Sequence, residues 1–169
     1  TRRSSDLLAA AATVPVINGL TDLLHPCQVL ADLQTVYEKR RRLEGLRLVY
    51  VGDGNNMAHS LMFGGAKVGM HVTICCPEKY RPDPEIVRLA KEDARRTKAM
   101  LEISHDPKSA VVGADVLYTD VWASMGQEQE HAERVKIFQP YQLNENLLSR
   151  AGAEAIVLAP CCQHEGLVQ

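Results

Sequence analysis

Four consecutive residues near the N-terminus carry side chains that could polarise a carbonyl group. His25, Pro26, Cys27 and Gln28 precede a run of apolar residues at helical spacing. Proline favours the first helical position, so the motif predicts a helix that begins at Pro26. Donors at a helix N-terminus can stabilise a developing oxyanion, and His25 and Gln28 are suitable donors. The alternative is that His25 only caps the helix and Gln28 lies on the surface.

A second group of polar side chains follows a predicted strand over residues 116–119. Its sequence is DVWASMG, from Asp120 to Gly126. Ligands of open α/β sheets bind outside the carboxyl ends of the strands, which is where this segment lies. Asp120, Ser124 and Met125 are therefore candidates for ligand binding. The alternative is that they are ordinary polar residues of a loop.

The C-terminal residues bring thiols and an imidazole close together in sequence. Cys161 and Cys162 lie two or three residues from His164. A thiol, a base and a carboxylate are the parts of a nucleophilic site, with His164 or His25 as the base. Zinc binding by the same four side chains is a rival, but adjacent cysteines are poorly spaced as chelating ligands, so we predict no metal. An altered C-terminus without chemistry is the third interpretation.

A glycine-containing turn lies between a predicted strand and a predicted helix. Residues 52–57 read GDGNNM, which is where a dinucleotide-binding fingerprint would lie. The third glycine is missing, because Met57 occupies its position. The motif therefore favours a tight turn over nucleotide binding, and we expect no cofactor.

Predicted strands and helices alternate along the chain. The strands are continuously apolar, which is typical of a parallel sheet covered on both faces. We therefore predict an α/β, Rossmann-like, three-layer domain with a parallel sheet of about five strands, formed by residues 1–169 as one domain. The expected helices span residues 1–12, 26–42, 55–68, 84–98, 107–112, 128–135 and 144–151, and the expected strands span 46–51, 71–76, 101–104, 116–119 and 155–158.

The composition excludes several classes of partner. Hydrophobic residues make up 46% of the 169 residues, charged residues 24%, and the net charge is −2. A near-neutral charge argues against a nucleic-acid or membrane surface, and no apolar run is long enough to span a bilayer. Five cysteines are an odd number, which does not suit a secreted disulfide framework. We read no export signal and expect a cytoplasmic protein.

Three motifs together resemble one enzyme family. Val16–Leu20 (VINGL), His25–Gln28 (HPCQ) and Asp120–Gly126 resemble the second, ornithine-binding domain of ornithine carbamoyltransferase. The resemblance runs from about Val14 to Leu158. It implies an amino-acid ligand and no cofactor.

The resemblance also implies a role for each candidate residue. The family's matching histidine and glutamine polarise the carbamoyl group, which gives this role to His25 and Gln28. The matching asparagine and aspartate hold the α-carboxylate and the α-amino group of ornithine, which assigns these groups to Asn18 and Asp120. Ser124 and Met125 would contribute nearby.

The resemblance fails at the C-terminal end. The family has His-Cys-Leu-Pro where this chain reads Ala159-Pro160-Cys161-Cys162. The phosphate-binding motif of the family's first domain is also missing from this sequence. We therefore expect a truncated, altered and engineered domain that binds an amino acid without transferring a carbamoyl group. The alternatives are an engineered Cys/His hydrolase on this scaffold, or a non-catalytic module that forms homo-oligomers through surface exposed by a missing lobe.

Overall fold

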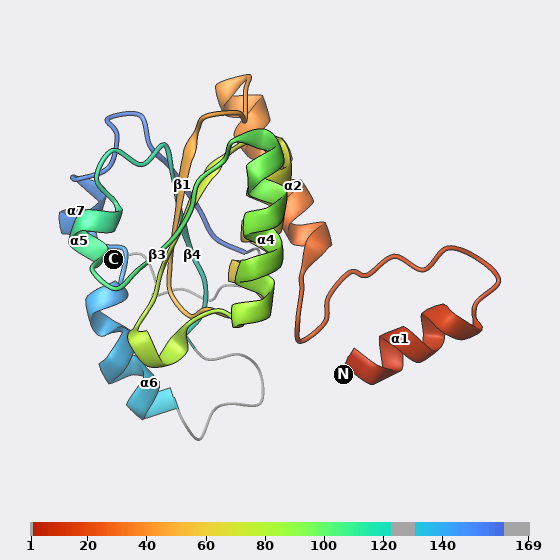
Figure 1. The fold of residues 1–169 in the computed structure, drawn as a ribbon. Coiled ribbons are helices and arrows are strands. Elements are labelled where there is room, and N and C mark those ends of the chain that lie inside the picture. Colours follow the sequence, from red (N-terminus) through yellow and green to blue (C-terminus); the bar gives the residue numbers. More distant parts are fainter. Residues whose placement is uncertain (1, 123–130, 161–169) are drawn as a thin grey trace.

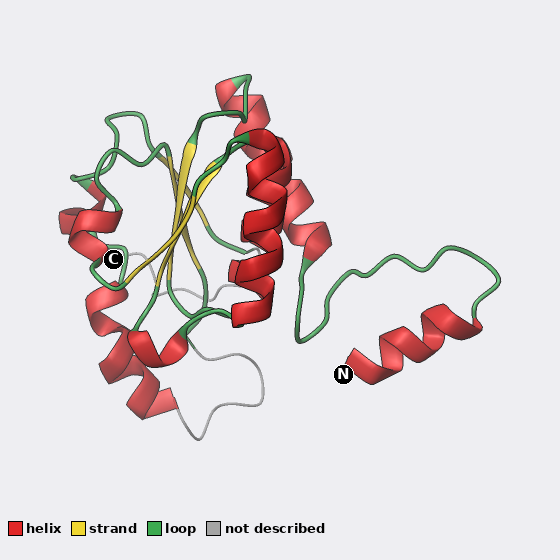
Figure 2. Ribbon diagram, in the orientation of Figure 1, coloured by secondary structure: helices red, strands yellow, loops and turns green. Residues whose placement is uncertain are grey.

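A five-stranded parallel sheet forms the centre of the molecule (Figures 1 and 2). The structure is a computed structural model, and it describes residues 2–122 and 131–160. The strand order is β3-β2-β1-β4-β5, and every neighbouring pair is parallel. This confirms the predicted fold class. The strands are β1 (Arg47–Val51), β2 (His71–Cys75), β3 (Leu101–Ser104), β4 (Val116–Thr119) and β5 (Ile156–Leu158).

Helices cover both faces of this sheet. Side chains alternate across a strand, so Leu48 and Tyr50 of β1 face one layer while Val49 and Val51 face the other. The first layer contains α2 (Pro26–Arg40), α3 (Asn56–Val68) and α4 (Pro84–Thr97). The second contains α5 (Pro107–Ala110), α6 (His131–Phe138), η3 (Gln139–Tyr141) and α7 (Glu145–Leu148), while η1 (Glu78–Tyr80) follows β2.

Local sequence signals set the ends of these helices. Asn55 caps α3 by accepting hydrogen bonds from the backbone N–H groups of Met57 and Ala58. Gly69 ends α3 with a positive φ of 77°, which glycine adopts at little cost. Pro26 is the first residue of α2, as predicted. The fragments α5 and α7 are shorter than expected, and α6 ends at Phe138 rather than near residue 135.

The N-terminal helix stands apart from the sheet. In Figure 1, α1 (Arg2–Ala11) is joined to α2 by a long extended segment and lies beside the body of the molecule. The side chains of Leu7 and Leu8 are mostly exposed. Within the described residues, none of the helices combines the length and the apolar character that crossing a membrane requires.

Candidate functional site at the carboxyl ends of strands β1 and β4

The candidate site lies where the strand order changes direction. From β1 the chain crosses to β2 on one side and later reaches β4 on the other. Val51 and Thr119, the last residues of β1 and β4, are register partners. Loops that leave two such strands on opposite faces diverge and leave a crevice for ligands. The residues that follow them, 52–55 and 120–122, therefore meet at one edge of the sheet.

Asp120 is held at this edge in a fixed orientation. Its side chain is only 6% exposed. One carboxylate oxygen accepts a hydrogen bond from Asn55 Nδ2 at 2.9 Å, and the other accepts the Val121 N–H at 2.7 Å. These two donors are neutral and orient the carboxylate, and an oriented carboxylate suits a ligand ammonium group.

Asn55 is the first site residue that the sequence analysis missed. Its Oδ1 accepts the N–H groups of Met57 and Ala58, at 3.0 and 3.3 Å, so the side chain is already fixed as the cap of α3. Its Nδ2 is thereby aimed at Asp120. The N-cap preference of asparagine is visible in the sequence, but its pairing with a residue 65 positions away is not.

Arg134 is the second residue that was missed. It is 5% exposed and forms an ion pair with Asp53, and its Nε donates to the Trp122 carbonyl. Its guanidinium also lies over the Tyr80 ring, 4.8 Å from the centroid. Burial raises the pKa of the Asp53 carboxyl; Arg134 opposes this effect and the neighbouring Asp120 adds to it. Arg134 thus ties the turn after β1 to the segment after β4.

His25 and Gln28 lie at the start of α2, against helix α3. The His25 N–H donates to Ser60 Oγ at 2.7 Å, and Ser60 in turn donates to the Asn56 carbonyl. His25 occupies the N-cap position of α2, but its side chain makes no capping hydrogen bond. Its Nδ1 atom is buried without a hydrogen-bond partner in the described structure. Gln28 is half-buried and donates to Asp32 Oδ1 at 3.0 Å.

Two side chains of α3 hold the loop that precedes His25. Asn56 Nδ2 donates to the Thr21 carbonyl at 2.8 Å. His59 accepts the Asp83 N–H at Nε2, which leaves Nδ1 protonated to donate to the Leu23 carbonyl. Burial lowers the pKa of His59, so the neutral ring is favoured. The loop is therefore attached to the same helix whose cap holds Asp120.

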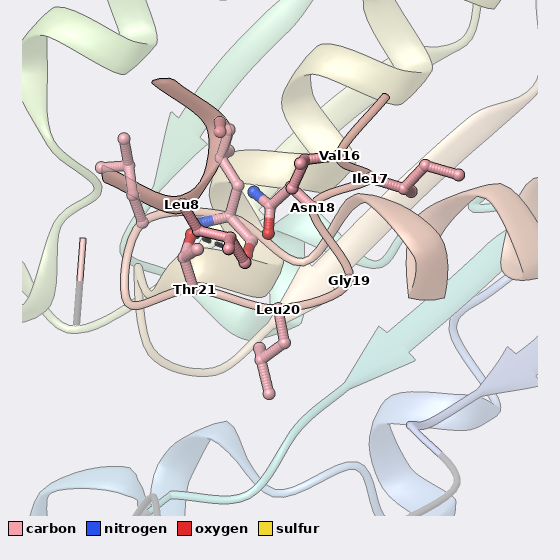
Figure 3. Close-up of a pocket in the computed structure, with 10 residues that line it drawn as sticks. Leu8, Val16, Ile17, Asn18, Gly19, Leu20 and Thr21 are labelled. Atoms are coloured by element: carbon pink, nitrogen blue, oxygen red, sulfur yellow. Dashed lines mark hydrogen bonds between the residues drawn. The ribbon is translucent and has the colours of Figure 1, made fainter. Parts of the chain in front are cut away.

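Asn18 lies in a different environment from Asp120 and His25. It lines a hollow of about 400 Å³ between α1 and the extended segment, together with Leu8, Ile17 and Leu20 (Figure 3). Its carbonyl is 3.5 Å from the Cys27 Sγ atom. Among the described hydrogen bonds, none joins the Asn18 side chain to Asp120 or His25. The structure thus brings Asp120 and His25 to one helix, α3, while Asn18 faces the hollow.

Five of the predicted site residues lie outside the described residues. They are Ser124, Met125, Cys161, Cys162 and His164. Of the cysteines that are described, Cys75 and Cys76 are fully buried, and burial raises their pKa values to about 12 and about 11. These two act as small core residues. In the described ranges, no group of histidine, cysteine and acidic side chains is arranged to hold a metal ion.

The strand-to-helix turn at residues 52–57 is built by close backbone contact. The Gly54 N–H donates to the Tyr80 carbonyl at 2.9 Å. A Cβ atom at Gly54 would clash with the backbone of residues 80–82. This turn has the tight form that the sequence predicted, and its glycine serves the packing of η1 against it.

Comparisons with known proteins identify the family of this chain. Residues 44–167 match the model of the aspartate/ornithine carbamoyltransferase Asp/Orn binding domain, and residues 1–38 match that of the carbamoyl-P binding domain. The resemblance noted in the sequence thus extends beyond the second domain, because the first 38 residues match the other one.

Individual ornithine carbamoyltransferases are also similar to this chain. The chain is 53% identical to an ornithine carbamoyltransferase of Thermococcus kodakarensis and 54% identical to that of Mycobacterium ulcerans, over 94% of its own length. It spans about half of each, 50% and 52% respectively. The solved Pyrococcus furiosus ornithine carbamoyltransferase superposes with a TM-score of 0.93 at 48% identity, over 98% of this chain and 53% of that one. The chain belongs to the aspartate/ornithine carbamoyltransferase family.

Proposed function

We propose that this chain is an amino-acid-binding domain of an ornithine carbamoyltransferase, and that it holds L-ornithine at the edge of β1 and β4. We also propose that it does not transfer a carbamoyl group by itself. The relatives' names supply the ligand, and the proposed setting is cytoplasmic. Cys27, Cys75 and Cys76 are free thiols, which suits a reducing compartment.

The fixed carboxylate of Asp120 is the observation that carries the proposal. Asn55 and the Val121 N–H orient both of its oxygens before any ligand arrives. A preorganised acceptor loses little entropy on binding, so its hydrogen bonds to an α-ammonium group contribute more to affinity. The second nearby carboxylate, Asp53, is neutralised by Arg134. Asp120 is therefore the anion that we expect to face the ligand.

The proposal that carbamoyl transfer is lost rests on two features. Ala159 and Pro160 occupy the positions where the family resemblance places histidine and cysteine. The chain also spans only about half of its relatives. We expect the chain by itself to stabilise the charge on a phosphate leaving group too weakly for the reaction.

Calorimetric titration with L-ornithine tests the binding proposal. We expect saturable binding to the unchanged chain and at least about tenfold weaker binding to Asp120→Asn, because a charge-assisted hydrogen bond contributes about 1.5–3 kcal/mol. The matched control is Glu78→Gln, since Glu78 is an exposed acid that follows β2 at the same edge of the sheet. Equal weakening by both variants, or no binding by the unchanged chain, would contradict the proposal.

A citrulline assay tests the second part. The purified chain is incubated with carbamoyl phosphate and L-ornithine, and we expect no product above the level without protein. Material purified from a host that lacks its own ornithine carbamoyltransferase removes the main source of background. Product formation that scales with protein concentration would show that the chain catalyses the reaction alone.

A further inference from the structure

Asp32 is a buried carboxylate that the site description has used only as a partner of Gln28. It lies in the second turn of α2 and is 6% exposed. Its Oδ1 accepts from Gln28 Nε2 at 3.0 Å, and its Oδ2 accepts from the Tyr118 hydroxyl at 2.8 Å. Tyr118 belongs to β4, 86 residues away in the sequence. A single carboxylate thus joins the first turns of α2 to the central sheet.

Such a group is costly to the fold. A buried carboxylate loses hydration, and its two side-chain hydrogen bonds to Gln28 and Tyr118 offset only part of that loss. Burial accordingly raises the pKa of Asp32, against the effects of Tyr118, Gln28 and His25. The other buried residues on this face of α2, Val29, Leu33 and Val36, are apolar. Core packing alone therefore does not explain an acid at this position.

The contacts of Asp32 continue toward the candidate site. The Tyr118 ring stacks on Tyr50, with 6.0 Å between ring centroids, and the Tyr50 hydroxyl lies 3.4 Å from Asn55 Oδ1. Asn55 holds Asp120. Tyr118 is also two residues before Asp120 on the same chain segment. One path of contacts therefore runs from the start of α2 to the carboxylate at the end of β4.

We infer that Asp32 is a positioning residue that fixes the Gln28 carboxamide relative to β4, and so sets the spacing between the His25–Gln28 end of α2 and Asp120. Two hydrogen bonds from different elements leave the Asp32 carboxylate little freedom to rotate. Because one Gln28 amide proton is directed at Oδ1, the plane of the Gln28 carboxamide is set as well. The meaning of this arrangement for ligand binding rests on the proposed function, but the arrangement itself can be tested without a ligand.

The chain contains its own control for this inference. Gln34 donates to Glu38 at 3.1 Å on the same helix, with the same spacing of four residues, but that pair is exposed. Exposed pairs of this kind contribute little to stability. NMR of the ligand-free chain can measure how fast the side-chain amide protons of Gln28 and Gln34 exchange with water. The two rates compare the Gln28–Asp32 pair with the exposed Gln34–Glu38 pair.

We expect a Gln28 amide proton to exchange about tenfold more slowly than those of Gln34, as one net hydrogen bond of about 1–1.5 kcal/mol implies. Asp32→Ala lowers this protection, whereas Asp32→Asn, which keeps an acceptor oxygen, restores it at least in part. Tyr118→Phe speeds Gln28 exchange when Asp32 is present and has no effect in the Asp32→Ala background. Glu38→Ala leaves Gln28 unchanged.

Equal exchange of Gln28 and Gln34 in the unchanged chain would overturn the inference, as would Gln28 exchange that does not respond to Tyr118→Phe. If Asp32→Ala does not fold, the Asp32→Asn and Tyr118→Phe variants decide the result, because both preserve the size of the side chain. No ligand is added, so a failure to bind L-ornithine would refute the proposed function and leave these results intact.

Discussion

Two regions of the molecule differ in how far their apolar side chains are buried. The N-terminal arm, residues 2–20, contains α1 and the extended segment, and the sheet body comprises residues 26–122 and 131–158. Among the described side chains, no buried hydrophobic residue precedes Val29. Of the twelve large exposed hydrophobic residues that the structure describes, six nevertheless belong to the short arm: Leu7, Leu8, Val14, Val16, Ile17 and Leu20.

The difference shows that the body supplies its own packing and the arm does not. In the body, two layers of helices bury the alternating side chains of the strands. The arm belongs to the first 38 residues, which match the carbamoyl-P binding domain rather than the Asp/Orn binding domain. An isolated helix of ten residues is marginally stable in water without tertiary contacts. We therefore expect the arm to contribute little to the stability of the body.

Truncating a leucine should give the largest difference in unfolding free energy between a change in the body and a change in the arm. Leu61 of α3 is 1% exposed, so Leu61→Ala should lower the free energy of unfolding by about 2–5 kcal/mol. Leu7 of α1 is 70% exposed, and Leu7→Ala should change it by no more than about 0.5 kcal/mol. Urea unfolding followed by circular dichroism measures both. Comparable losses in the two variants would show that the arm packs as firmly as the core.

Replacing a glycine by alanine should give the second largest difference in stability between the body and the arm. At Gly54 a Cβ atom would meet backbone atoms of Tyr80, Arg81 and Pro82, so Gly54→Ala should cost about 1–3 kcal/mol. At Gly19, in the arm, a Cβ atom would meet nothing within 4 Å. Gly19→Ala should therefore leave the midpoint of urea unfolding unchanged or slightly higher. A destabilised Gly19→Ala variant would reveal contacts of the arm that the structure does not show.

Protonation of His59 should loosen the junction between the two regions. His59 joins the Leu23 carbonyl to the Asp83 N–H, and its pKa is lowered from 6.5 because burial outweighs the opposing effects of the Leu23 carbonyl, Asp83 and Asp53. The unfolded chain thus binds the proton at higher pH. The contribution of His59 to stability is complete above about pH 6.5 and falls as the pH drops through 6.5 toward the lowered value.

Unfolding free energies between pH 7.5 and pH 5 should therefore decrease more steeply for the unchanged chain than for His59→Gln, which cannot be protonated in this range. Parallel curves for the two proteins would assign the acid sensitivity to other groups.

The smallest effect on stability should come from the exposed face of the arm, where association is the informative property. Ile17 is 82% exposed, and exposed apolar patches favour self-association. We expect Ile17→Ser to lower the oligomer fraction seen by sedimentation velocity while the free energy of unfolding stays within about 0.5 kcal/mol. Leu89→Ser, at a less exposed position of α4, is the control on the body. An effect confined to Leu89→Ser would place the associating surface on the body instead.

The sequence predicted the body well because its signals are local. Continuous apolar strands that alternate with predicted helices indicated the parallel sheet, and the start of α2 at Pro26 was correct. The site partners were not predicted, because Asn55–Asp120 and Asp53–Arg134 join residues that are 65 and 81 positions apart. Local motifs showed which residues could bind a ligand, but only the folded sheet shows which side chains hold them.

Asn18 is a second example of what local motifs do not show. A motif match assigned it to the amino-acid site beside Asp120, whereas the structure places it in the hollow formed by the arm. Sequence similarity identifies a segment, but the position of an exposed segment depends on what packs against it. This makes the location of the ligand the central question about the molecule.

An NMR titration of the isotopically labelled chain with L-ornithine tests that location most directly. We predict that the backbone amide signals of Asn55, Asp120 and Val121 move together as ligand is added, while those of Leu8 and Asn18 remain in place. The Asp120→Asn variant should show no such shifts at the same ligand concentrations. Shifts confined to the arm, around Asn18 and its hollow, would contradict the account and move the amino-acid site away from the edge of β1 and β4.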